Sequence, residues 1–232
     1  MTNQKGRAVH GQAAHAREDD KHLEALKLYD EAILAYQEDK DILGLAEVFA
    51  DRSIVYRHLY DETNDKNFLI IAKYEMLASV EMVEEGRNKE ATVLPYFNLA
   101  KVYESLGQLN EAKEFYQKTV NGMTNNPPSM HNRPAVLADM KIHLATCEYK
   151  TGDKSALDRA LQALADLEIA DEVKYNKDVW LSGGHMKIAE VIRADNTEKA
   201  EDHLQKAKEI IDSNPDLKLR KAQWENLAAS FN

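Results

Sequence analysis

Residues 98–116 read NLAKVYESLGQLNEAKEFY, and the spacing of small and aromatic residues in this stretch decides the fold. Ala100 and Ala112 are small enough to let two helix backbones approach closely, and Tyr103 and Tyr116 can fill the volume beside them. Gly107 stands between the two groups, where a left-handed residue can end one helix before the next begins. The stretch therefore predicts two short antiparallel helices that pack through their small residues.

The same spacing recurs along the whole chain. Small residues at the equivalent position of successive first helices are 40, 47, 45 and 44 residues apart, namely Ala13, Ser53, Ala100, Ala145 and Ala189. The second helices repeat the spacing of Ala112, Tyr116 and Thr119 as Ala25, Tyr29 and Ala32, as Ala72, Met76 and Ser79, and as Ala200, Leu204 and Ala207. A single helix pair cannot bury its apolar face alone, so such units are stabilised by stacking. We predict repeats at approximately 3–38, 41–86, 89–122, 133–168 and 171–213, and a capping helix at 215–230.

This pattern resembles the tetratricopeptide repeat (TPR). The family's period is about 34 residues, so these units resemble the long-period variants of bacterial regulators and kinesin light chains. We assign the additional residues to long helices and to insertions at His58–Asn67 and Asn121–Pro134. Period alone also fits HEAT or armadillo repeats of about 40–47 residues, but the Gly107 and Tyr116 spacing favours TPR. The resemblance implies an all-α fold, a right-handed α-solenoid of about five antiparallel helix pairs plus the capping helix, in one domain over residues 1–232.

Composition agrees with a helical protein outside the membrane. The chain has 232 residues, of which 30% are charged, and only 9 Gly and 5 Pro. No apolar stretch reaches the 18 or more residues of a membrane span, and Met1–Asp20 lacks the apolar core of a signal peptide. The single cysteine, Cys147, cannot form an internal disulfide and fits a reducing compartment. We expect a cytoplasmic protein.

Charge and motifs exclude several functions. With 40 acidic and 30 basic residues the net charge is −10, which repels a nucleic-acid backbone. No glycine-rich phosphate loop, His-Glu-x-x-His motif or cysteine pair is present. Cys147 has His143 one turn before it, but a lone small thiol beside Ala145 is typical of core filling. Ser182–His185 lacks a third group that could orient a triad. We therefore predict no enzyme, catalytic residue, metal site or cofactor.

The TPR resemblance places the binding surface on the first helices, which line a concave groove. The positions around each small residue give the predicted peptide- or protein-binding set: Ile54, Arg57, Phe97, Asn98, Lys101, His143, Tyr149, Lys187, Glu190 and Arg193, accompanied by His10, Arg17, Asp51, Glu104 and Thr146. Mixed charges with apolar anchors suit an extended peptide or a helix. The carboxylate clamp of chaperone cofactors is excluded, because Asn98 matches it but Ala50, Ile54, Asp139 and His143 replace its basic and amide residues.

Two further features are a pair of adjacent glycines in the last repeat and the apolar residues of the capping helix. Gly183 and Gly184 lie within the helix expected at Asp171–Arg193, where each glycine costs about 1 kcal/mol relative to alanine. A kink, a break, a close helix crossing or backbone left open for a ligand would each explain them. In the capping helix we expect Leu219, Trp224 and Leu227 to form the inner face.

These observations favour a noncatalytic scaffold or adaptor that binds a peptide or protein segment in its groove. Two alternatives stay open, a peptide-responsive regulator of the bacterial sensor type and a self-assembling structural component, for which a homo-oligomer would be seen by light scattering. Bacterial sensors carry an effector domain ahead of their repeats. Repeat one is expected to start within about ten residues of Met1, which leaves no room for an effector, so the scaffold is favoured.

Overall fold

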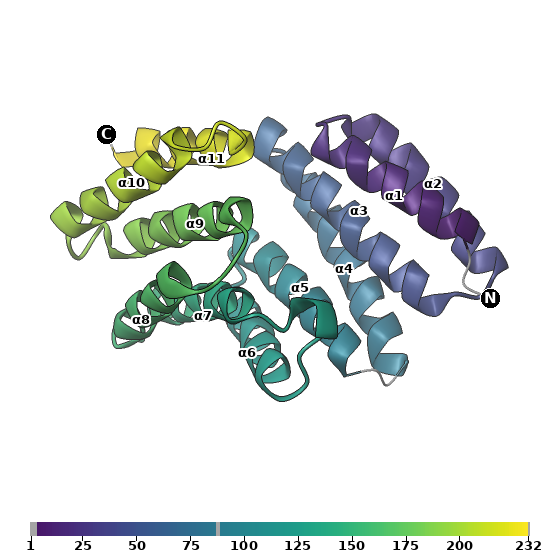
Figure 1. Ribbon diagram of the computed structural model, residues 1–232, viewed down its shortest axis with the longest axis horizontal. Coiled ribbons are helices and arrows are strands. Elements are labelled where there is room, and N and C mark those ends of the chain that lie inside the picture. The colour runs from purple at the N-terminus through teal and green to yellow at the C-terminus, as the bar shows by residue number, and fades with distance from the viewer. Residues whose placement is uncertain (1–3, 87–88, 232) are drawn as a thin grey trace. The chain divides into compact units, whose positions relative to one another are not determined.

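The computed structural model describes residues 4–86 and 89–231, which form eleven α-helices, two short 3-10 helices and no strand (Figure 1). The α-helices are α1 (Gln4–Glu18), α2 (His22–Glu38), α3 (Ile42–Thr63), α4 (Lys66–Glu85), α5 (Val93–Ser105), α6 (Leu109–Asn125), α7 (Pro134–Lys150), α8 (Ala156–Ile169), α9 (Lys174–Ile192), α10 (Thr197–Asp212) and α11 (Lys218–Phe231). The 3-10 helices are η1 (Glu90–Thr92) and η2 (Ser129–His131). The expected all-α fold of paired helices is confirmed.

The chain divides into two compact units, Met1–Asn126 and Pro127–Asn232, called unit 1 and unit 2. Unit 1 stacks the pairs α1–α2, α3–α4 and α5–α6, and unit 2 stacks α7–α8 and α9–α10 with α11 against α9 and α10. Each unit thus has the stacked antiparallel pairs of an α-solenoid, as expected. The single domain over residues 1–232 stays a prediction.

Local sequence explains several helix ends. Asp41 caps α3 by accepting a hydrogen bond from the Gly44 amide at 2.9 Å. Gly107 and Gly152 take positive φ angles of 74° and 108° after α5 and α7, so they end these helices as glycine can. The insertion expected at His58–Asn67 is wrong in form, because α3 continues to Thr63 and left-handed Asn64 ends it. The additional length is therefore helix rather than loop.

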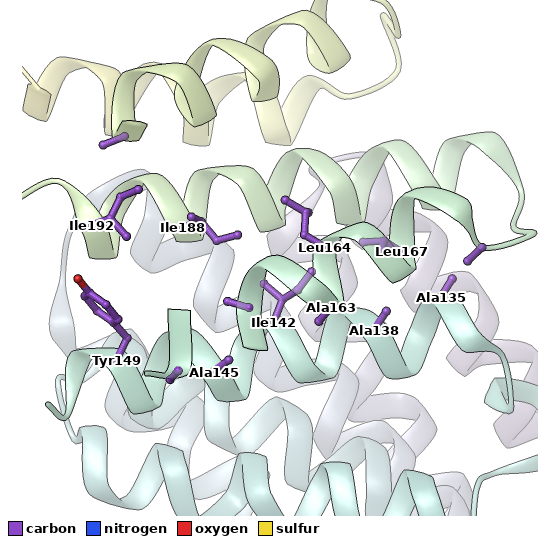
Figure 2. Packing of buried hydrophobic residues seen from close by; sticks show 14 residues of the cluster. Ala135, Ala138, Ile142, Ala145, Tyr149, Ala163, Leu164, Leu167, Ile188 and Ile192 are labelled. Carbon is purple, nitrogen blue, oxygen red and sulfur yellow. The ribbon is translucent and has the colours of Figure 1, made fainter. Parts of the chain in front are cut away.

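The recurring small residues all lie in the core. Ala13, Ser53, Ala100, Ala145 and Ala189 are buried, and so are the second-helix residues of repeats one, two, three and five. In repeat four, for whose second helix the sequence interpretation named no packing residues, Ala160, Leu164 and Leu167 have the same spacing and are buried. Figure 2 shows this arrangement in unit 2, where Ala138 and Ala145 of α7 lie with Ala163 and Leu164 of α8. Close helix contact through small side chains therefore holds each pair together.

Gly184 marks a close helix crossing within an unbroken α9. A Cβ atom added there would lie 3.0 Å from Leu164 Cδ1 and 3.1 Å from Ile142 Cδ1, so a side chain at this position would require α7 and α8 side chains to shift. At Gly183 the same atom would lie 3.1 Å from a terminal nitrogen of the Arg220 guanidinium. The interpretation as a break is wrong, because α9 runs from Lys174 to Ile192. Packing at the crossing accounts for Gly184.

We predict opposite effects at two helical glycines. Gly184→Val should lower the free energy of unfolding by about 1–3 kcal/mol, because a branched side chain would overfill the crossing. Gly11→Ala should raise it by about 0.5–1 kcal/mol, because no atom lies within 4 Å of the position that its Cβ would take and alanine is the better helix former. Urea denaturation checks both changes. Equal effects at the two sites would contradict the crossing.

The capping helix α11 turns Trp224 and Leu227 inward, as expected, but not Leu219. Leu219 is 47% exposed, so its assignment to the inner face is wrong. The half-buried residues Arg220, Trp224, Leu227 and Phe231 follow the i, i+4, i+7, i+11 spacing of one helical face. Trp224 Nε1 donates to the Leu204 carbonyl at 2.9 Å, and Phe231 packs against the core of unit 2. Leu219 directly precedes Arg220 in the sequence and therefore lies outside this face.

Candidate protein-binding surface

The first helices form the inner wall of each unit. In unit 1, α1 contacts α3 and α3 contacts α5, whereas no comparable contact joins α2 to α4 or α4 to α6 among the described residues. In unit 2, α7 contacts α9 directly, and the described part of α8 has no such contact with α10. Since first helices approach one another more closely than second helices, the concave side of each stack carries the first helices.

Three of the sequence-predicted residues meet between α1 and α3. His10 Nε2 lies 3.0 Å from Asp51 Oδ2, and an Arg17 guanidinium nitrogen lies 3.4 Å from Asp51 Oδ1. His10 Nδ1 contacts the Tyr36 hydroxyl at 3.2 Å, a partner on α2 that the sequence interpretation missed. Burial and the nearby Asp51 carboxylate raise the pKa of Tyr29, whose ring meets His10 edge-on. These groups join the first two repeats.

Two of the predicted apolar anchors are buried. Phe97 is 7% exposed and packs on Tyr116 with ring centroids 5.9 Å apart, and Tyr149 is 6% exposed within the core cluster of unit 2. Figure 2 shows Tyr149 on α7 near Ile192 of α9. Phe97 precedes Ala100 by three residues and Tyr149 follows Ala145 by four, so both share the buried face of their helix. The prediction that Phe97 and Tyr149 are apolar anchors exposed to a ligand is therefore corrected.

Two other α5 residues of the predicted set, Lys101 and Glu104, are tied to this packing. The Lys101 ammonium lies 4.0 Å from the centroid of the Phe97 ring, where a cation–π interaction orients it. Glu104 accepts a hydrogen bond from the Tyr116 hydroxyl at 2.7 Å. Lys101 is half-buried, so the buried Phe97 positions a charge at the concave side.

Three predicted residues of unit 1 have side chains that no hydrogen bond or ion pair with another described residue engages: Ile54, Arg57 and Asn98. All three are half-buried on α3 and α5, which contact each other. Neither Arg57 nor Asn98 forms a hydrogen bond or ion pair with another described residue. One apolar, one cationic and one amide side chain are thus offered on neighbouring first helices. This combination can hold a peptide backbone and an acidic side chain.

In unit 2 the predicted residues Glu190 and Arg193 contact neighbouring elements. Lys150 Nζ donates to Glu190 at 3.0 Å, which connects α7 with α9. The Arg193 guanidinium lies 4.6 Å from the centroid of the Phe231 ring, so α11 covers part of it. Lys187 is half-buried on α9. Charged groups of this inner face therefore also stabilise the unit.

Two further predicted residues of α7, His143 and Thr146, contact their own helix, whereas Tyr149 reaches a residue beyond α9. His143 is half-buried and lies 4.0 Å from the buried Asp139, and Thr146 is buried with its hydroxyl bonded to the Ile142 carbonyl. The Tyr149 hydroxyl donates to Asp195, as does Lys154, both at 2.5 Å. Sequence analysis missed Lys154 and Asp195, because 41 residues separate them.

The two candidate nucleophiles have structural roles. Cys147 is fully buried, consistent with core filling. The Ser182 hydroxyl donates to the Asp178 carbonyl one turn earlier at 2.6 Å. His185 Nδ1 faces His203 Nδ1 at 2.9 Å, and burial, aided by His203, lowers the pKa of His185 to about 4. Near neutral pH His185 is therefore an uncharged link between α9 and α10.

Comparison with known proteins agrees with this geometry. A family model described as tetratricopeptide repeat matches residues 95–120, the pair α5–α6. Residues 95–120 are therefore a tetratricopeptide repeat. The comparison with curated proteins found no match. Among the described residues, no helix is long and apolar enough to cross a membrane.

Solved structures share the TPR fold. BtubC (BKLC) from P. vanneervenii superimposes with a TM-score of 0.63 at 20% identity, over 87% of this chain and 77% of that one. A putative kinesin light chain with nearly identical TPR-like repeats from Podosopora anserina gives 0.63 at 15% identity, over 90% and 97%. A substituted form of that same kinesin light chain gives 0.64 at 15% identity, over 91% and 96%. The similarity to long-period, kinesin light chain-like repeats is confirmed.

Proposed function

We propose that this TPR protein is a noncatalytic, cytoplasmic scaffold or adaptor that binds a peptide or protein segment on the concave side of its first helices. TPR folds generally mediate protein–protein interaction. The proposal rests on three half-buried side chains of unit 1, which lie on two adjoining first helices: Ile54, Arg57 and Asn98. Lys101, oriented by Phe97, adds a second cation on the same helices.

The chemistry of this surface suggests the ligand. Arg57 and Lys101 supply positive charge, Asn98 can donate and accept hydrogen bonds with a peptide backbone, and Ile54 offers a small apolar contact. A segment with an acidic side chain flanked by an apolar residue fits these groups. In unit 2, His143, Lys187, Glu190 and Arg193 extend the proposed binding set, whereas Tyr149 acts through packing.

We predict that the triple variant Ile54→Ser, Arg57→Ser, Asn98→Ala weakens binding of selected peptides by about tenfold or more, because it removes the anchor, the charge and the amide together. Peptides would first be selected from a displayed random library with the parent protein and then measured by fluorescence anisotropy. Since all three residues are half-buried and make no hydrogen bond or ion pair with other described residues, thermal unfolding should change little.

The matched control is Ile70→Ser, Lys73→Ser, Tyr74→Ala on α4, a second helix. Ile70 and Tyr74 are exposed, so this variant changes similar chemistry outside the first helices. It should bind the selected peptides as the parent does. Equal binding by the parent and the first-helix variant, or loss only in the α4 variant, would remove the concave surface from consideration.

A further inference from the structure

A second candidate surface of unit 2 lies at the turn between α8 and α9. Ile169, Val173 and Tyr175 are 85%, 66% and 48% exposed in and beside this turn. Met130 of η2 is 83% exposed. These four, called the turn surface, are the majority of the large apolar side chains that are exposed in the described part of unit 2, the others being Leu161 and Leu219. Ile169, Val173 and Tyr175 lie within seven residues of one another, and a group of exposed apolar side chains of this kind marks an interaction site rather than scattered surface residues.

The turn surface is held by a fixed network. Arg133 donates to Glu172 Oε1 at 2.7 Å, which fastens the segment after η2 to the α8–α9 turn. The same oxygen accepts bonds from the Val173 amide and from Asn176 Nδ2, each at 3.1 Å. Lys177 Nζ donates to the Ala170 carbonyl at 2.9 Å. The exposed side chains thus stand on an ordered turn, which lowers the entropy cost of binding.

The edge of the turn surface carries uncompensated negative charge. Glu168 and Asp171 are exposed, and neither carboxylate has a hydrogen bond or ion pair with another described residue. The nearby cations are engaged within the unit, because Arg133 pairs with Glu172 and Lys174 pairs with Asp178 at 2.5 Å. A ligand that brought its own cations would therefore meet two free carboxylates beside apolar side chains.

We propose that the turn surface binds a basic amphipathic helix of another protein. Apolar side chains of such a helix would cover Ile169, Val173, Tyr175 and Met130, and its lysines or arginines would pair with Glu168 and Asp171. A second copy of this chain is a poorer occupant, because the net charge of −10 opposes self-association. The site is separate from the concave surface, since its residues lie at the junction of α8 with α9 and in a 3-10 helix.

The test uses two synthetic 18-residue helical probe peptides, one of leucine and lysine and one of leucine and glutamate, titrated by fluorescence anisotropy into the full chain. The lysine peptide should bind at least about tenfold more tightly than the glutamate peptide at low salt. Ile169→Ser with Val173→Ser should weaken the lysine peptide by about tenfold or more, because apolar area is no longer buried. Glu168→Lys with Asp171→Lys should weaken it at low salt, with a smaller loss at high salt.

The control is Leu161→Ser, which removes an exposed apolar side chain elsewhere on α8 and should bind as the parent does. All substituted side chains are exposed, so circular dichroism should show unchanged folding. Unaltered affinity in both double variants, or equal affinity for the two peptides, would overturn the proposal. So would a dimer in light scattering that Ile169→Ser with Val173→Ser dissociates, because a second copy would then be the occupant.

Discussion

Ala100→Arg is expected to lower the free energy of unfolding by more than about 3 kcal/mol. Ala100 is fully buried on α5, in the helix pair that the TPR model matches. Arginine would need volume that the close contact of α5 with α6 does not provide, and it would place a charge among apolar groups. Urea denaturation followed by circular dichroism measures the change.

Ala8→Arg on α1 is the matched control, because Ala8 is helical and lies at the surface of the repeat-one pair, five residues before the buried Ala13. It should stay within about 0.5 kcal/mol of the parent, as surface substitutions usually do. If Ala100→Arg also unfolded like the parent, the small residues would not determine helix packing, and the register of all five repeats would be wrong.

The sequence contains most of the fold because the decisive pattern is local. Ala160, Leu164 and Leu167 face one way on α8 through their spacing alone, and the same spacing recurs in the other second helices. The residues that the spacing selects in α2 and α10 are all buried, namely Ala25, Tyr29, Ala32, Ala200, Leu204 and Ala207. The insertion at His58–Asn67 was mispredicted, because α3 continues until the left-handed Asn64 ends it.

The candidate site could be predicted only in part. The TPR resemblance implies which helices line the concave side, but not which side chains already have partners. His10 and Asp51 are 41 residues apart, and Tyr149 and Asp195 are 46 residues apart, so no local pattern reveals these bonds. The burial of Phe97, by contrast, could have been predicted, because it lies one turn before Ala100 on the same helical face.

A charged junction of three helices in unit 1 also could not be predicted from a local pattern, because its residues are far apart in the sequence. Arg52 of α3 donates two bonds to Glu75 of α4, at 2.7 and 3.0 Å, and also contacts Asp30 of α2. The Arg52 and Glu75 side chains are only 15% and 13% exposed. Arg52→Met keeps the apolar stem but leaves the Glu75 carboxylate buried without its cation. We expect a loss of about 3–5 kcal/mol at neutral pH in urea denaturation.

Asp30→Asn is the matched control, because Asp30 is 65% exposed and an exposed ion pair contributes less than about 1 kcal/mol. Arg52→Met combined with Glu75→Gln should recover much of the loss, since the buried charge is then gone. If the single variant were as stable as the parent, or if removing Glu75 recovered nothing, Arg52 would contribute through its packing and not through its charge.

The loss in Arg52→Met should depend on pH in a defined direction. Burial raises the pKa of Glu75 above its ordinary value of 4.5 even though Arg52 lowers it, and removing Arg52 raises it further. The folded variant then binds a proton more tightly than the unfolded chain, so its stability falls as pH rises from the unfolded to the folded pKa. The difference from the parent should therefore be largest at neutral pH and shrink on acidification toward 4.5, as urea denaturation at several pH values would show. A difference that stayed constant over this range would assign the loss to packing around the Arg52 stem.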